Sequence, residues 1–223
     1  MEGYVSTAAA IAFFDLDGTL VVGQTQRLLV SFMRREGMVG LRFVVGVGLW
    51  FGAYRLGLVK PTDNARARAA GLMAGRSVAG VAALMDRFTA EELAPRLHAG
   101  AVSALRDHRE RGDEVVIVSA ALMPVVEGLA RHLSVDSCEG TRLEERDGAF
   151  TGAVAGRALY GPEKVSAAKR VLEDRGVDAS SCSAYADHES DLDLLELVGH
   201  PVAVSPRAGL AAVARERGWR IIP

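Results

Sequence analysis

The sequence has few cysteines and no excess of either charge. Its 223 residues include two cysteines, Cys138 and Cys182, and carry a formal net charge of -2. Two cysteines without metal-ligand spacing give neither a disulfide framework nor a zinc site, so we expect a reducing compartment such as the cytoplasm. Without a basic stretch there is no electrostatic surface for nucleic acid. Nucleic acid is therefore not expected as a partner.

Long apolar runs are also missing. The most apolar stretch, residues 43–54, holds twelve uncharged residues between Arg42 and Arg55, fewer than the roughly 18 to 20 that span a bilayer. Three interpretations of this stretch stay open: a buried helix, an apolar wall for a substrate, or a patch for a membrane surface or a second copy of the chain. The first residues lack a basic start, which argues against a signal peptide.

Short apolar runs do occur, and each ends in polar residues. The runs at residues 11–14, 115–118, 183–186 and 201–204 predict buried strands. Helical patterns separate them, as in the segment that starts at Pro162. Strands that alternate with helices predict a parallel sheet with helices on both faces, which is an α/β fold.

A long helical segment interrupts this alternation after the first strand. Ser77 is a candidate N-cap, and Thr89 with Glu92 has the spacing of a capping box that would begin another helix. The sequence thus predicts a helical cap at residues 23–100, inserted into a core made of residues 1–22 and 101–223.

Polar residues that could take part in catalysis or ligand binding follow three of the predicted strands. Asp15 and Asp17 end the first strand, Ser119 ends the second, and Asp187 begins a polar loop after the third. Lys164 lies near the start of a predicted helix. The carboxyl ends of parallel strands are where open α/β sheets bind ligands, so these residues are candidates for one site.

These residues also resemble the motifs of a known family. The stretch FFDLDGTL at residues 13–20 resembles the first motif of the haloacid dehalogenase superfamily, and Ser119, Lys164 and the Asp187-x-x-x-Asp191 loop resemble the others in order. The resemblance covers essentially the whole chain. The helical insert after the first motif resembles the phosphoserine-phosphatase-like branch (subfamily IB). It implies a three-layer, Rossmann-like α/β core with an inserted cap, and phosphoryl transfer through an aspartyl phosphate.

The resemblance assigns a role to each motif residue. Asp15 would be the nucleophile, since a carboxylate needs no deprotonation at neutral pH, and Asp17 the general acid and later the base. A phosphate dianion beside carboxylates requires a cation, and Mg²⁺ suits oxygen ligands. Asp191 would lie behind the metal site and orient it. The expected metal ligands are Asp15, the backbone carbonyl of Asp17, and Asp187; the expected phosphate-binding residues are Gly18, Thr19, Ser119, Ala120 and Lys164.

The substrate is less clearly indicated. Phosphoserine phosphatases generally carry a glutamate at the position of Gln24, so the ammonium-binding charge is missing here. Arg55, with Arg66 and Arg68, is a candidate for a substrate carboxylate, and His188 beside Asp187 is a further specificity candidate. We expect a small phosphomonoester such as phosphoserine, histidinol phosphate or a similar amine-bearing metabolite. The alternatives are a more hydrophobic or lipid-like phosphomonoester, or a catalytically silent phosphate-binding module.

Overall fold

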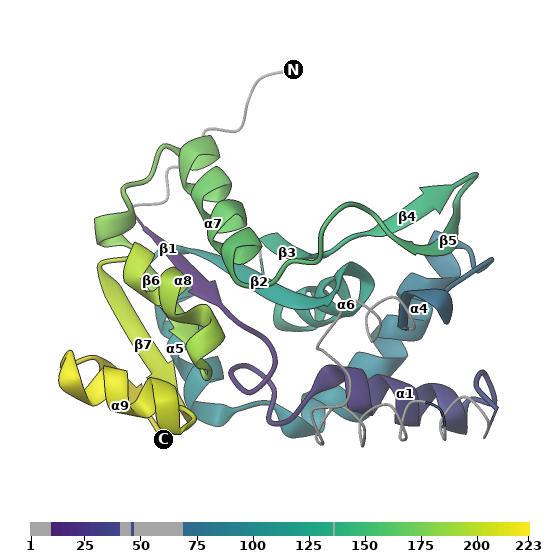
Figure 1. The fold of residues 1–223 in the computed structure, drawn as a ribbon, viewed down its shortest axis with the longest axis horizontal. Helices are drawn as coiled ribbons and strands as arrows, with labels where there is room; N and C mark the ends of the chain where they lie inside the picture. The colour runs from purple at the N-terminus through teal and green to yellow at the C-terminus, as the bar shows by residue number, and fades with distance from the viewer. Residues whose placement is uncertain (1–9, 41–45, 47–68, 136) are drawn as a thin grey trace.

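A six-stranded parallel sheet forms the centre of the molecule (Figure 1). The computed structural model describes residues 10–40, 46, 69–135 and 137–223. β1 lies inside the sheet, between β2 and β6. In spatial order the strands are β3 (Ser137–Thr141), β2 (Glu114–Leu122), β1 (Ile11–Phe14), β6 (Ser183–Ala186), β7 (His200–Val204) and β8 (Arg220–Ile222).

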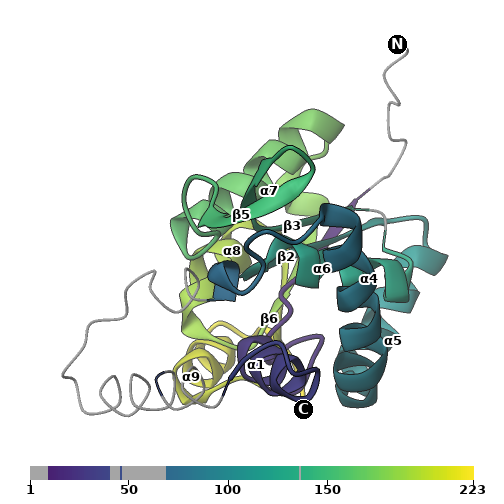
Figure 2. The same ribbon diagram turned by 90° about the vertical axis from the view of Figure 1, so that its right-hand side faces the viewer.

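Helices cover both faces of the sheet, because successive side chains of a strand point to opposite sides. Ala12 and Phe14 of β1 join the cluster that includes α5 (Ala99–Glu110) and α6 (Met123–Leu133). Ile11 and Phe13 join the opposite cluster. That second layer consists of α7 (Pro162–Arg175), α8 (Leu192–Leu197) and α9 (Ala208–Glu216). Figure 2 shows α7 and α8 on one side of the strands and α5 and α6 on the other. The predicted three-layer α/β fold is confirmed.

Helices also fill the described part of the chain between β1 and β2. Besides α5, they include α1 (Thr25–Arg35), α4 (Val78–Phe88), a π-helical turn (Thr89–Leu93) and a 3₁₀ turn (Ala94–Arg96). α4 packs on α6, and its ring of Phe88 lies 5.4 Å from that of Phe32 in α1. Within the described ranges, no helix is long and apolar enough to cross a bilayer. Apart from residue 46, residues 43–54 lie outside those ranges. The cap boundaries at residues 23 and 100 stay a prediction.

Of the two capping signals in this segment, Ser77 and Thr89, only the first begins an α-helix. Ser77 caps α4 as predicted and accepts the N–H of Gly80 at 3.1 Å. The prediction of a helix that begins at Thr89 was wrong, because α4 continues directly into the π-helical turn there. The next helix, α5, begins ten residues later, and the Nδ1 atom of His98 accepts the N–H of Ala101 at its start.

A short hairpin lies outside the main sheet. It consists of β4 (Leu143–Arg146) and β5 (Ala149–Val154), which pair antiparallel. Asp147 and Gly148 connect them with φ angles of 52° and 75°, a conformation that favours this dipeptide in two-residue turns. An Asp-Gly dipeptide between two short strands is a common sequence signal for such a hairpin.

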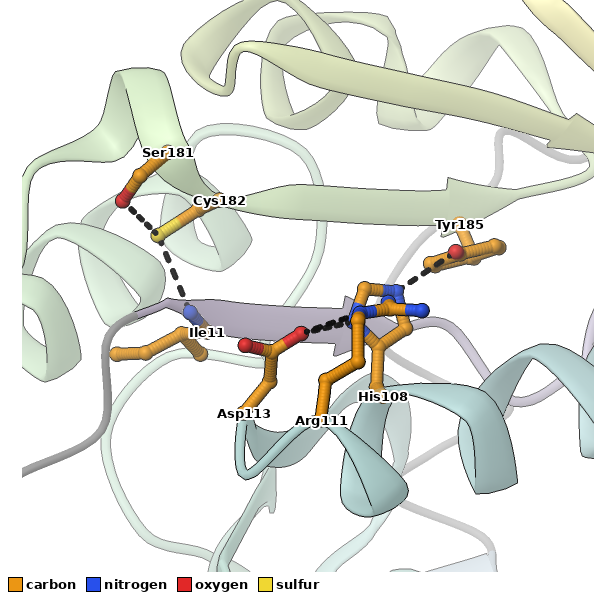
Figure 3. Close-up of polar contacts among 7 residues, drawn as sticks. All are labelled: Ile11, His108, Arg111, Asp113, Ser181, Cys182 and Tyr185. Carbon is orange, nitrogen blue, oxygen red and sulfur yellow. Dashed lines mark hydrogen bonds and ion pairs between the residues drawn. The ribbon is translucent and has the colours of Figure 1, made fainter.

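A buried polar network fixes α5 to the sheet behind the end of β1 (Figure 3). His108 of α5 lies 2.8 Å from the hydroxyl of Tyr185 and 2.7 Å from the carboxylate of Asp113. The ring of Tyr185 stacks on Phe14 at 4.2 Å. Burial lowers the pKa of His108, against the opposing effect of Asp113, so the ring is neutral near pH 7. This network fixes the last residues of β1 and β6 side by side.

Candidate active site

The ends of β1 and β6 bring two carboxylates to the same edge of the sheet. Asp15 follows β1 and donates its backbone N–H to the carbonyl of Tyr185 at 2.9 Å, and Asp187 follows β6. Gly18 leaves room for the carboxylate of Asp187, since a Cβ atom at this position would lie 2.3 Å from Oδ2 of Asp187. Its φ of 82° is also a conformation that glycine adopts without strain. Gly18 is therefore required twice, for its backbone and for its lack of a side chain.

Lys164 connects Asp15 to Asp191. Its Nζ atom lies 2.6 Å from Oδ1 of Asp15 and 2.8 Å from Oδ1 of Asp191, and all three side chains are buried. Gly161 and Pro162 begin α7 so that Lys164 lies in its first turn. Burial alone would lower the pKa of Lys164, but Asp15 and Asp191 outweigh it and raise the pKa. The lysine is thus a permanent cation in the site.

Asp17 is held by the start of α1. The backbone N–H of Thr25 donates to Oδ1 of Asp17 at 2.6 Å, and the Thr25 hydroxyl donates to Oδ2 at 3.2 Å. Burial raises the pKa of Asp17 to about 6, although the bond from the Thr25 backbone opposes this rise. A carboxyl group with such a pKa can both give and take a proton near neutral pH. Sequence reasoning missed Thr25; the only signal for it was its place at the first turn of a predicted helix.

The motifs also contain two buried hydroxyl groups, those of Thr19 and Ser119. The Oγ1 atom of Thr19 is buried and has no hydrogen-bond partner among the described residues. Ser119 is buried, and its Oγ atom accepts the N–H of Ala121 at 3.2 Å, which leaves its hydroxyl hydrogen as a donor. Ser119 lies within β2 rather than at its end, at a shift in the pairing of β2 with β3. Such irregularities re-aim side chains.

Asp187 has a cationic neighbour from another loop. The Nε atom of Arg207, just before α9, lies 3.4 Å from Oδ2 of Asp187. Burial and the charge of Asp15 raise the pKa of Asp187 to about 6, although Arg207 opposes the rise. Two carboxylates that destabilise each other in a buried site favour a bound cation.

The donor set fits a hard divalent ion. The described residues contain no group of three or more His, Cys, Asp and Glu side chains arranged as a metal cage. Mg²⁺ does not need one, since it is commonly held by one or two carboxylates together with waters and substrate oxygens. Asp15 and Asp187 meet that requirement.

A sequence profile of the haloacid dehalogenase-like hydrolases matches residues 12–196, which include the site residues from Asp15 to Asp191 but not Arg207. The chain belongs to this family. Phosphoserine phosphatase SerB1 of Mycobacterium tuberculosis is 33% identical over 216 residues, which cover 95% of this chain and 70% of that protein. Histidinol-phosphatase of Neisseria meningitidis is 27% identical over 217 residues, 95% of this chain and 97% of that protein.

A solved structure of similar fold adds to these relatives. A protein of unknown function from Bordetella pertussis superimposes with a TM-score of 0.86 at 29% identity, and covers 97% of this chain and 99% of that chain. The haloacid dehalogenase-like family, predicted from the motifs, and its phosphoserine-phosphatase-like branch, predicted from the helical insert, are confirmed. The chain is a phosphatase of this family.

The candidate specificity residues are only partly described. Gln24 is exposed directly before α1, and its side chain does not cap the helix. His188 accepts the N–H of Ser190 at 3.0 Å through Nδ1 and so caps the turn that contains Asp191. Arg55 lies outside the described residues, as do Arg66 and Arg68.

Proposed function

We propose that this haloacid dehalogenase-like phosphatase hydrolyses a small phosphomonoester with Mg²⁺, through an aspartyl phosphate on Asp15. One observation carries the proposal: the buried Lys164 lies 2.6 Å from Asp15, at the edge of the sheet where Asp187 also lies. This arrangement supplies a fixed nucleophile, a fixed cation and a second carboxylate for the metal. The proposed roles of the site residues follow from it.

In the first step, Asp15 attacks the phosphorus atom while the ester oxygen leaves. Lys164 compensates the negative charge that builds up on the phosphoryl oxygens. The hydroxyl groups of Ser119 and Thr19, which donate to no other side chain or carbonyl in the described part of the chain, supply hydrogen bonds to those oxygens, with the backbone at Gly18 and Ala120 beside them. Asp17, with its pKa of about 6, protonates the leaving oxygen.

In the second step, a water molecule hydrolyses the acyl phosphate. Asp17 is ionised after the first step and accepts the proton of the attacking water. Thr25 holds the Asp17 carboxylate through both of its oxygens, so the same group faces the leaving oxygen and then the water. Asp191 keeps Lys164 aimed at Asp15 from the other side.

Mg²⁺ would be held by Asp15, the backbone carbonyl of Asp17 and Asp187. When bound, it neutralises part of the charge of the phosphate dianion beside these carboxylates.

For the substrate we propose an amine-bearing phosphomonoester such as phosphoserine or histidinol phosphate. The names of the two relatives support this class. Gln24, exposed at the start of α1, offers an amide oxygen to an ammonium group without the charge of a glutamate. We therefore expect weaker discrimination in favour of an amine than a glutamate would give.

The test is phosphate release from a panel of phosphomonoesters, with Mg²⁺ and with a chelator. The panel contains phosphoserine, histidinol phosphate, phosphoethanolamine, glycerol phosphate and a lysophospholipid-type phosphate. We expect Mg²⁺-dependent release, which Asp15→Asn abolishes. Asp193→Asn removes an exposed carboxylate of α8 and serves as the matched control, with the activity of the wild type.

Absence of release from every ester would leave a phosphate-binding module as the alternative. Fluoroberyllate, a mimic of the phosphoryl group, then separates the two cases. Binding by the wild type but not by Asp15→Asn shows a competent nucleophile site whose ester lies outside the panel. No binding by either protein contradicts the proposed enzyme.

A further inference from the structure

Arg207 contacts Asp187 with both its backbone and its side chain. The backbone N–H of Arg207 donates to the carbonyl of Asp187 at 2.9 Å, and its Nε atom lies 3.4 Å from Oδ2. The Arg207 side chain is 56% exposed, whereas that of Asp187 is 8% exposed. The arginine therefore reaches the buried carboxylate from the solvent side of the site.

The two basic residues of the site serve different carboxylates. Lys164 forms its ion pairs with Asp15 and Asp191. In the described part of the chain, Arg207 is the cation that forms an ion pair with Asp187. The oxygen that it contacts, Oδ2, is also the one that faces Gly18. Arg207 thus offsets part of the charge of the carboxylate that we assign to the metal, at the oxygen that faces Gly18.

We propose that Arg207 is a positioning residue that competes with the divalent cation for Asp187. This inference rests on the proposed function, since it requires the metal at Asp187. Without the metal, the guanidinium group compensates part of the buried charge and keeps the carboxylate in place. A divalent cation on the same carboxylate repels the guanidinium group, which then turns outward to solvent. The affinity of the site for its metal is accordingly lower than the two carboxylates alone would give.

The position of Arg207 keeps the free-energy cost of leaving Asp187 small. It is the residue before the first turn of α9, and its half-exposed side chain can regain water when it leaves the carboxylate. Its backbone bond to Asp187 does not depend on the side chain. The strand end is therefore held in place in both states, and only the guanidinium group moves.

The test is a titration of the full-length protein with Mn²⁺, in which free Mn²⁺ is measured by electron paramagnetic resonance. We expect Arg207→Gln to bind Mn²⁺ about 3- to 10-fold more tightly than the wild type. Arg207→Lys keeps the charge and should bind as the wild type does. Arg215→Gln, which removes an exposed charge in the last turn of the same helix, is the matched control and should also leave the affinity unchanged.

Two further outcomes separate this inference from the proposed function. If the wild type binds Mn²⁺ but Arg207→Gln binds with equal or lower affinity, the competition is overturned and the metal site stands. If the folded wild type does not bind Mn²⁺, the proposed metal site fails, and the role of Arg207 fails with it. In the Asp187→Asn background, Arg207→Gln should have no effect on the remaining Mn²⁺ affinity; an undiminished gain there would overturn the competition at Asp187.

Discussion

Thr25 binds both carboxylate oxygens of Asp17, one through its backbone N–H and the other through its hydroxyl. The first turn of α1 thereby fixes the proposed acid and base. Because these bonds favour the charged form, they oppose the rise that burial causes in the pKa of Asp17. The position of this carboxylate and its pKa therefore both depend on where α1 begins.

Thr25→Val should raise the pKa of Asp17 above about 6 and loosen its carboxylate, since one of the two bonds from Thr25 is lost. We expect kcat to fall about 10-fold, less than the roughly 100-fold or more for loss of the acid itself. The limb of the pH-rate profile that reports Asp17 should move to higher pH. Thr25→Ser keeps the hydroxyl and should therefore have the kcat and the pH-rate profile of the wild type. An unshifted profile in Thr25→Val would show that Asp17 is not the titrating group.

Gly18→Ala should abolish metal binding as well as activity, because the added Cβ atom would lie 2.3 Å from Asp187. A displacement of about 1 Å at a reacting centre costs roughly 100-fold in rate. Gly23→Ala is the matched control: Gly23 also has a positive φ, of 110°, but nothing lies within 4 Å of its Cβ position.

Both alanine variants should lose about 1–2 kcal/mol of stability from backbone strain. Only Gly18→Ala should lose Mn²⁺ affinity in a titration followed by electron paramagnetic resonance. Equal losses of affinity in the two variants would contradict the close approach of Gly18 to Asp187.

The sequence predicted the positions of the motifs more accurately than the contacts between them. Strand-end carboxylates follow from short apolar runs, and Lys164 from the Gly161-Pro162 helix start. Thr25 and Arg207 could not be found in this way, because their contacts depend on how α1 and α9 are placed in three dimensions. The strand β3 was missed because it has no apolar run, and β8 because it is only three residues long.

Asp187→Asn should stabilise the protein at pH 7 when a chelator is present. The pKa of Asp187 is about 6 in the folded protein and near 3.8 in a free side chain, so the protonated carboxyl favours folding below pH 4. That contribution is lost as the pH rises through 6. Asparagine cannot ionise, so the variant should exceed the wild type by about 1–2 kcal/mol at pH 7, allowing for solvent screening.

The measurement is urea unfolding of both proteins at pH 4 and pH 7. At pH 4 the difference should disappear, because the carboxyl is protonated in the folded wild type. Addition of Mg²⁺ at pH 7 should stabilise the wild type but not the variant. A wild type that is more stable than Asp187→Asn in chelator at pH 7 would show that the buried charge is already fully compensated.

Gln24→Glu should improve the recognition of an amine-bearing substrate. A hydrogen bond to a charged group contributes about 1 kcal/mol more than a neutral one, so KM for phosphoserine should fall roughly 5-fold. KM for glycerol phosphate, which has no amine, should not fall. Gln26→Glu adds the same charge at a half-buried position of α1 and is the control. If both variants lower KM equally, the effect is due to general charge and not to contact at Gln24.

The central claim is that Asp15 carries the phosphoryl group. The most direct measurement is rapid acid quenching of the enzyme during turnover of a substrate labelled with ³²P in its phosphate, followed by peptide mapping. We expect label that requires Mg²⁺, appears on the peptide with Asp15 and is absent in Asp15→Asn. Turnover with label on another residue, or burst-phase turnover with no labelled protein, would contradict it.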